Sequence, residues 1–155
     1  MTKFEELGIK QSILDGLKEI GFDEAFPIQE ATIPVLLSGR DVIGQAHTGT
    51  GKTAAFGISM LSGVDANKII QGLVLAPTRE LALQITDEIK KFAKHTGIKV
   101  VSIYGGQGMG VQLQALRHGV EIVVATPGRL IDHLKQGSIE LNDIKYVVLD
   151  EADTM

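Results

Sequence analysis

Two spacings of hydrophobic residues alternate along this chain, and each predicts its own kind of element. Short continuous apolar runs predict strands that are buried on both faces of a sheet, at 41–46, 72–76, 100–104, 120–125 and 146–149. Apolar residues that recur every three or four positions predict amphipathic helices, at 9–20, 28–37, 52–61, 78–97, 112–117 and 127–136. Gly21, Gly97 and Gly137 follow three of these helices, and glycine favours the conformation that ends a helix.

The alternation of strands and helices predicts an α/β fold with a mostly parallel sheet that is flanked by helices. In such sheets, ligands bind beyond the carboxyl ends of the strands. The segments with glycine, proline or charge all follow predicted strands: Ala46–Thr53, Pro77–Glu80, Gly105-Gly106, Thr126–Arg129 and Asp150–Asp153. Their shared position predicts that the functional residues gather at one edge of the sheet.

The segment Ala46-His47-Thr48-Gly49-Thr50-Gly51-Lys52-Thr53 has the composition of a phosphate-binding loop between a strand and a helix. Gly49 and Gly51 would let the backbone N–H groups approach an anion, and the helix start adds positive partial charge. Lys52 would place a full charge near the outer phosphates, and the Thr53 hydroxyl would face a Mg²⁺ ion. The first position is Ala46 instead of the usual glycine, and an ordinary glycine-rich turn is the alternative.

Asp150 and Glu151 follow the last apolar run. In phosphate-loop enzymes an Asp at the tip of a buried strand helps to hold Mg²⁺, and a neighbouring Glu can activate the attacking water. Asp153 is close enough to couple to a neighbouring strand. The alternative is an acidic helix start without catalytic function, because carboxylates also stabilise that position.

Phe22 and Gln29 flank a helix start at Pro27. An aromatic face can stack on a base, and a glutamine amide can read an adenine edge with one acceptor and two donors. The residues alone favour a simpler interpretation, in which Phe22 belongs to the core and Gln29 is a solvated helix residue. Further along, Thr126 is a candidate N-cap, with Pro127 at the first helical position.

Composition narrows the class of protein. The chain has 155 residues, 44% hydrophobic and 22% charged, which predicts one globular domain. It has no Cys, no apolar signal core and no apolar run long enough for a bilayer, so we expect a soluble, cytoplasmic protein without membrane contact. A net charge of −4 argues weakly against a general nucleic-acid binder, so any such contact must be local. The histidines lack paired ligand spacing, which favours surface or loop positions: His47, His95, His118 and His133.

These motifs together resemble one family, the DEAD-box ATP-dependent RNA helicases. Asp150-Glu151-Ala152-Asp153 spells the four letters of its name. Gly21–Gln29, with Phe4 upstream, is similar to its Q motif, and Ala46–Thr53 is similar to its motif I. The remaining motifs follow in family order: Pro77-Thr78-Arg79-Glu80-Leu81-Ala82, Gly105-Gly106 and Thr126-Pro127-Gly128-Arg129.

The resemblance implies a RecA-like P-loop domain that binds ATP and Mg²⁺. Phe22 would stack on adenine with support from Phe4, and Gln29 would read the adenine edge. Lys52, Thr53 and Asp150 would hold phosphates and metal, with Glu151 at the water. RNA would be held by its backbone, without sequence preference, by Pro77, Thr78, Arg79, Gly105, Gly106, Thr126, Pro127, Gly128 and Arg129. A few such contacts predict a shallow salt slope of about −2 for single strands.

Two features depart from the family. Ala25-Phe26 stands where Pro followed by Thr or Ser is more usual, which removes a hydroxyl contact. The family's first domain also continues beyond the acidic motif, and a second similar domain follows it, so the resemblance implies that residues 1–155 are an incomplete first domain. Such a fragment would bind nucleotide and hydrolyse it poorly. A non-catalytic nucleotide- or RNA-binding module and a DNA-directed helicase domain are the alternatives.

Overall fold

A computed structural model describes residues 2–47 and 49–155 of this chain. The chain forms two compact units, each with its own internal packing. The first unit comprises residues 1–63 and 88–97, and the second comprises residues 64–87 and 98–155. Each unit is described by itself.

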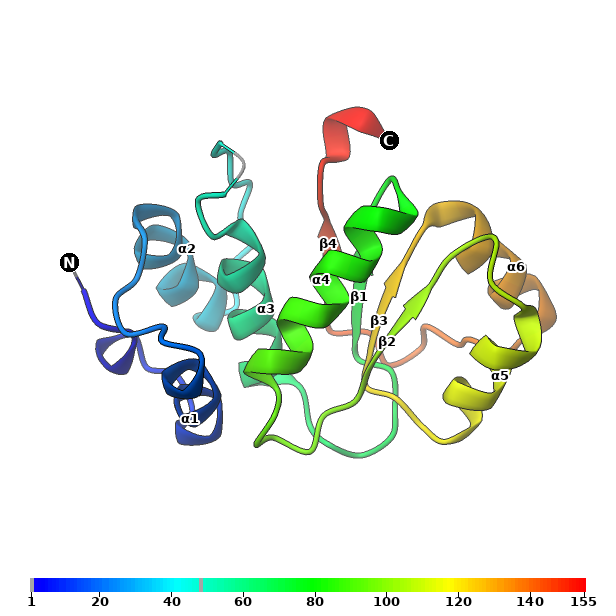
Figure 1. The fold of residues 1–155 in the computed structure, drawn as a ribbon, viewed down its shortest axis with the longest axis horizontal. Helices are drawn as coiled ribbons and strands as arrows, with labels where there is room; N and C mark the ends of the chain where they lie inside the picture. Colours follow the sequence, from blue (N-terminus) through cyan, green and yellow to red (C-terminus); the bar gives the residue numbers. More distant parts are fainter. Residues whose placement is uncertain (1, 48) are drawn as a thin grey trace. The chain divides into compact units, whose positions relative to one another are not determined.

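The first unit is helical (Figure 1). It contains η1 (Phe4–Glu6), α1 (Gln11–Glu19), α2 (Pro27–Leu37), α3 (Lys52–Gly63) and the end of α4 (Arg79–Phe92). Its core is apolar and includes Ile13, Leu17, Ile33, Ile58, Met60, Leu61, Ile89 and Phe92. Helix α1 approaches the Phe92 backbone so closely that a Cβ at Gly16 would lie 2.9 Å from the Phe92 carbonyl oxygen, so only glycine fits there.

The prediction of a strand at 41–46 is wrong, because these residues belong to no strand. Ile43 is 100% exposed and therefore packs against nothing. A central strand needs neighbours that satisfy its backbone N–H and C=O groups. Only Val42 and Ile43 have a strong strand preference in this segment, and Gly44-Gln45 interrupts the run. An apolar run this short does not predict whether the segment finds a neighbouring strand to pair with.

The second unit is built on a parallel sheet with the strand order β2-β3-β1-β4. The strands are β1 (Gly72–Leu75), β2 (Val100–Ile103), β3 (Ile122–Ala125) and β4 (Tyr146–Leu149). Register is regular, with Gly72 opposite both Ile122 and Tyr146. The predicted parallel α/β sheet flanked by helices is therefore confirmed. Every residue of the central strand β3 is buried, whereas Val147 and Leu149 of the edge strand β4 are exposed.

Helices α5 (Met109–Arg117) and α6 (Pro127–Gln136) pack on one face of this sheet. Their shared core contains Leu73, Ile103, Val123, Ala125, Leu130 and Ile139, with Leu116 against it. Helix α6 buries Leu130 and His133, whereas Ile131 and Leu134 are exposed. The face of α6 that packs against the sheet is therefore rotated away from the face that carries Ile131 and Leu134. Among the described residues no helix is long and apolar enough to cross a membrane.

Candidate functional site

Gln29 is a structural centre of the first unit and not a solvated helix residue, because its exposure is 1%. Its Oε1 accepts a hydrogen bond from the Phe26 backbone N–H at 2.9 Å, which closes the first turn of α2. Its Nε2 donates to the Gly51 carbonyl oxygen at 3.1 Å. One amide thus ties the start of α2 to the end of the glycine loop, and its other N–H has no acceptor in the part of the chain that the structure describes.

Gly51 is required by both its conformation and its surroundings. Its φ is +85°, in the left-handed region, and a Cβ there would overlap the Gln29 amide nitrogen and lie 2.9 Å from Phe26 Cδ2. Gly49 has φ +84° with nothing within 4 Å of an added Cβ, so the space beside it is open. The loop therefore has one tightly packed glycine and one that faces free space.

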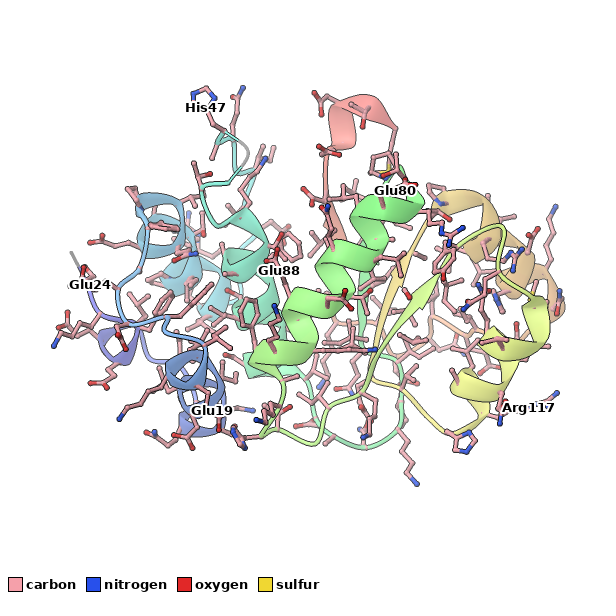
Figure 2. The ribbon with its side chains drawn as sticks, in the orientation of Figure 1. Glu19, Glu24, His47, Glu80, Glu88 and Arg117 are labelled. Carbon is pink, nitrogen blue, oxygen red and sulfur yellow. The ribbon has the colours of Figure 1, made fainter. Side chains whose placement is uncertain are left out.

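The rest of the glycine loop leads outward and then into α3. Ala46 is half-buried, and His47 lies exposed at the outer end with its ring directed away from the chain (Figure 2). The Thr50 hydroxyl donates to the His47 carbonyl oxygen at 2.6 Å and so closes a local turn. Lys52 and Thr53 are half-buried in the first turn of α3. Thr48, also a predicted loop residue, lies outside the described residues.

Phe22 was interpreted either as a core residue or as a residue that stacks on a base, and it is neither buried nor fully exposed. It is 37% exposed, so part of the side chain reaches the surface. The ring stacks on Phe4 with centroids 6.4 Å apart and meets Phe92 at 5.8 Å. Phe4 itself is buried.

The acidic segment of the second unit continues the edge strand. The Asp150 N–H donates to the Leu75 carbonyl oxygen at 3.0 Å and extends the β1–β4 ladder by one residue. Asp150 Oδ1 accepts from the Glu151 N–H at 3.0 Å. Glu151 is exposed in the left-handed conformation, with φ 51° and ψ 45°, and precedes the short helix η2 (Ala152–Thr154). A non-glycine residue held there costs about 1–3 kcal/mol, and such strain concentrates at functional sites.

The three segments with predicted RNA contacts come together in the second unit. Thr78 caps α4 with its hydroxyl, which accepts from the Leu81 N–H at 3.2 Å. The Arg79 guanidinium lies over the Tyr104 ring, 5.0 Å from its centroid, and near Gly106. It has no ion pair among the described residues, so its charge faces outward. Tyr104 immediately precedes Gly105-Gly106 and therefore joins the first segment to the second.

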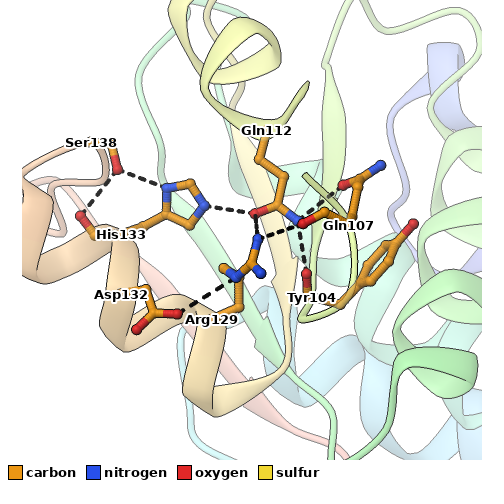
Figure 3. Close-up of polar contacts among 7 residues, drawn as sticks. All are labelled: Tyr104, Gln107, Gln112, Arg129, Asp132, His133 and Ser138. Atoms are coloured by element: carbon orange, nitrogen blue, oxygen red, sulfur yellow. Dashed lines mark hydrogen bonds and ion pairs between the residues drawn. The ribbon is translucent and has the colours of Figure 1, made fainter. Parts of the chain in front are cut away.

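Gln112 joins the second segment to the third (Figure 3). Its exposure is 1%, and its Nε2 donates to the Tyr104 carbonyl oxygen at 2.9 Å and to Gln107 Oε1 at 3.0 Å. Its Oε1 accepts from Arg129 Nη1 at 3.2 Å and lies 2.7 Å from His133 Nε2. All four hydrogen-bonding positions of this amide are therefore occupied.

Arg129 is engaged inward, which changes its expected role. Its Nη1 also donates to the Gln107 carbonyl oxygen at 2.9 Å, and its Nε lies 3.6 Å from Asp132 Oδ2. Thr126 occupies the N-cap position of α6 but forms no side-chain cap hydrogen bond within the described part of the chain. The first-turn N–H groups at Gly128 and Arg129 therefore remain as donors, since Pro127 has none.

The expectation that all four histidines lie on the surface or in loops is wrong for His133, whose exposure is 0%. Its Nδ1 lies 2.7 Å from the Ser138 hydroxyl, opposite the Gln112 contact. Burial lowers the pKa of His133, and the nearby Arg129 charge lowers it further. No motif marks Tyr104, Gln112 or His133, so the sequence did not indicate their place in this network. The available signal was at Gln112, a polar residue between the apolar Val111 and Leu113.

The described residues contain no cluster of three or more His, Cys, Asp or Glu side chains that could hold a metal by themselves. The predicted metal residues are Thr53 and Asp150. They offer a hydroxyl and a carboxylate, which are the hard oxygen donors that Mg²⁺ prefers. Asp150 uses Oδ1 in a backbone contact, and Oδ2 has no hydrogen-bond partner among the described residues.

Comparison with known proteins agrees with these motifs. The DEAD/DEAH box helicase family model matches residues 26–155. The chain is 51% identical to the DEAD-box ATP-dependent RNA helicase CshA of Bacillus cereus (strain ATCC 10987 / NRS 248), covering 100% of this chain and 30% of that protein. It is 53% identical to the ATP-dependent RNA helicase DeaD of Escherichia coli (strain K12), covering 99% of this chain and 25% of that protein.

Solved structures show the same relationship. A DEAD box protein from the hyperthermophile Methanococcus jannaschii superposes with a TM-score of 0.94 at 40% identity, covering 100% of this chain and 43% of that chain. The RNA helicase Prp28 from Chaetomium thermophilum, bound to ADP, superposes with a TM-score of 0.89 at 46% identity, covering 100% and 39%. The chain thus spans less than a third of the length of the two curated relatives described above.

Proposed function

Because the chain belongs to the DEAD/DEAH box helicase family, we propose that it is the ATP- and RNA-binding part of an RNA helicase that couples ATP hydrolysis to local duplex separation. The observation that carries this proposal is the buried Gln29 amide, which links the start of α2 to Gly51 of the glycine loop. A loop that bound phosphate alone would not need an amide in that position. An adenine nucleotide needs both a base contact and a phosphate contact.

ATP fits the residues of the first unit. The open space beside Gly49 accommodates a phosphate close to the backbone, and the half-buried Lys52 would neutralise its charge. The exposed face of Phe22 would stack on adenine, and the remaining N–H of Gln29 would donate to the base edge. Bound ATP would supply the phosphoryl group that water attacks.

Mg²⁺ would be held by the Thr53 hydroxyl and the Asp150 carboxylate together with phosphate oxygens, because Mg²⁺ commonly uses one or two carboxylates and substrate phosphates. Lys52 and Asp150 would thereby stabilise charge during phosphoryl transfer. The Glu151 carboxylate would accept the proton of the attacking water. Its exposure and its left-handed backbone are consistent with a residue held for that purpose.

RNA would bind along the second unit by its backbone. Arg79 would supply the positive charge, because its guanidinium rests on Tyr104 without an acidic partner in the described chain. Gly105-Gly106 would allow close approach, and the N–H groups at Gly128 and Arg129 would donate hydrogen bonds to a phosphate at the start of α6. Pro77, Thr78, Thr126 and Pro127 would shape these contacts. Such backbone contacts would not read the base sequence.

Hydrolysis by this span alone should be slow. An arginine supplied from outside the nucleotide site can be worth roughly 10³–10⁵ in rate, and we propose that it comes from a second RecA-like domain, as the resemblance implies. The isolated chain should therefore bind adenine nucleotide weakly and show little stimulation by RNA. ATPase activity that RNA raises many-fold in this chain would contradict that expectation.

The decisive experiment substitutes Lys52. In a titration with a fluorescent adenine nucleotide, Lys52→Ala should abolish binding, whereas the control Lys18→Ala, an exposed lysine of the same unit, should leave it unchanged. Equal affinity of the Lys52 variant and the wild type would refute a phosphate-binding role for the loop. Glu151→Gln should retain nucleotide binding while it removes residual hydrolysis, which separates an enzyme from a non-catalytic binding module.

The choice of RNA over DNA is tested by competition. Matched single-stranded RNA and DNA oligomers should compete for a labelled RNA, and we expect RNA to be the stronger competitor because 2′-hydroxyl contacts distinguish the two. Equal competition would favour the DNA-directed alternative.

A further inference from the structure

We propose that Gln112 is a positioning residue for RNA binding, which sets the spacing between the Gly105–Gln107 loop and the first turn of α6 and is itself oriented by His133. This inference rests on the proposed function, because it assigns a role at the same RNA surface. Gln112 and His133 lie outside the family motifs of this chain. The geometry that carries it is the set of contacts in Figure 3.

The amide of Gln112 can be assigned without ambiguity. Its nitrogen faces two acceptors, the Tyr104 carbonyl oxygen and Gln107 Oε1, so it must be the donor side. Its oxygen faces the Arg129 guanidinium, which can only donate. His133 Nε2 lies 2.7 Å from the same oxygen and must therefore carry the hydrogen. The Gln112 side chain consequently has one satisfied orientation, and a flipped amide would face donors with donors.

A second contact ties the Gly105–Gln107 loop to the first turn of α6. Arg129 Nη1 bridges to the Gln107 carbonyl oxygen, so the guanidinium and the Gln112 amide form one closed unit between α5, α6 and the loop after β2. Behind it, Ser138 contacts His133 Nδ1 and fixes the ring. Every buried side-chain nitrogen or oxygen in the described chain has a partner, so loss of the Gln112 amide would leave several groups unpaired.

This arrangement explains why Arg129 points inward although it ends a segment with predicted RNA contacts. A phosphate would be held by N–H groups at Gly128 and Arg129 and by the Gly105–Gln107 loop, and both depend on the spacing that Gln112 and the Arg129 guanidinium set. Gln112 would touch no nucleotide. It would act through the backbone that does.

The test compares Gln112→Met with Gln114→Met, in the same helix, where the side chain is exposed. Three quantities are measured on the whole chain: the anisotropy of a labelled oligouridylate at low salt, the affinity for a fluorescent adenine nucleotide, and hydrogen exchange at 105–107 and 128–130. Gln112→Met should raise exchange at both segments and weaken RNA binding by about tenfold, with nucleotide affinity unchanged. Gln114→Met should change none of the three.

The outcomes separate this inference from the proposed function. RNA affinity within twofold of the wild type in Gln112→Met would overturn the positioning role while the function stands, and a parallel loss of nucleotide affinity would overturn it as general damage. No RNA binding by the wild type would refute the function and the positioning role together. If Gln112→Met does not fold, His133→Leu decides, because it removes only the support behind the amide and should weaken RNA binding about threefold. RNA binding unchanged in His133→Leu would then overturn the proposal.

Discussion

Two buried glutamines organise the two units of this chain, and they do so differently. Gln29 and Gln112 have the same exposure, 1%. Among the described residues, the Gln29 amide forms hydrogen bonds with two backbone groups, the Phe26 N–H and the Gly51 carbonyl oxygen, and we propose that its remaining N–H serves a ligand. Gln112 has all four positions filled, three of them by contacts with other side chains.

The difference shows how one side chain type can serve recognition or support. An amide with a free donor is available to read a base, whereas a saturated amide can only hold its neighbours in place. The same division separates two of the arginines in the second unit, Arg79 and Arg129. Arg79 lies exposed over Tyr104, and Arg129 is bonded to Gln107 and Gln112. A side chain with unfilled hydrogen-bonding positions is therefore a candidate for ligand binding, whereas one with every position filled is structural.

The largest effect should come from Gly51→Ala. The left-handed backbone costs an alanine roughly 1–2 kcal/mol, and its Cβ would also displace the Gln29 amide. Nucleotide binding should be lost, and the free energy of unfolding from urea titration should fall by more than the backbone cost. The control is Gly137→Ala, which has φ +75° but nothing within 4 Å of its Cβ. Equal destabilisation by the two variants would show that the Gln29 contact contributes nothing.

A smaller loss of stability is expected for Arg129→Gln. It leaves the Gln107 carbonyl and Gln112 Oε1 short of a donor in a partly buried site, which costs about 1–3 kcal/mol. Urea unfolding monitored by circular dichroism measures this change. A variant as stable as the wild type would show that Arg129 is not structural.

Arg79→Gln should behave in the opposite way. Because Arg79 is exposed, its substitution should change stability by no more than about 0.5 kcal/mol. It should weaken RNA binding and make the dependence of log K on log salt shallower by about 0.7, the value for one phosphate contact with a single strand. An unchanged salt slope would place Arg79 outside the RNA surface.

The smallest effect concerns pH and His133. Its pKa is lowered by burial and by Arg129, with Asp132 acting weakly in the opposite direction. Below the ordinary pKa near 6.5, the unfolded chain binds a proton that the folded chain resists, so stability should rise with pH through this window. The slope from this one group is at most about 1.4 kcal/mol per pH unit.

His133→Leu should remove that slope, whereas the control His118→Gln, at an exposed histidine, should retain it. The acidic counterpart in the first unit is Glu19, whose pKa is lowered by hydrogen bonds from Lys94 and His95. Its contribution to stability is present above its ordinary pKa of 4.5 and is lost as pH falls below that value, so the two pH windows can be distinguished. An imidazole titration by NMR that places the His133 pKa above the ordinary value would contradict the burial argument.

The sequence by itself determined the sheet strands of the second unit, the helices around them and the family. Each rests on a local signal: continuous apolar runs at β1 and β3, helical spacing in α4, and motifs read in order. The helix starting at Pro27 and the left-handed Gly137 after α6 follow equally from local chemistry. These features depend on residues that are close in the chain.

Only the tertiary structure decided which polar residues are buried and what they hold. Burial of Gln29, Gln112 and His133 depends on partners that lie 22, 8 and 21 residues away. Exposure of Ile43 likewise reflects pairing that an apolar run cannot guarantee. A hydrogen bond between distant residues leaves no period or motif in the chain, because its geometry exists only once the elements have packed.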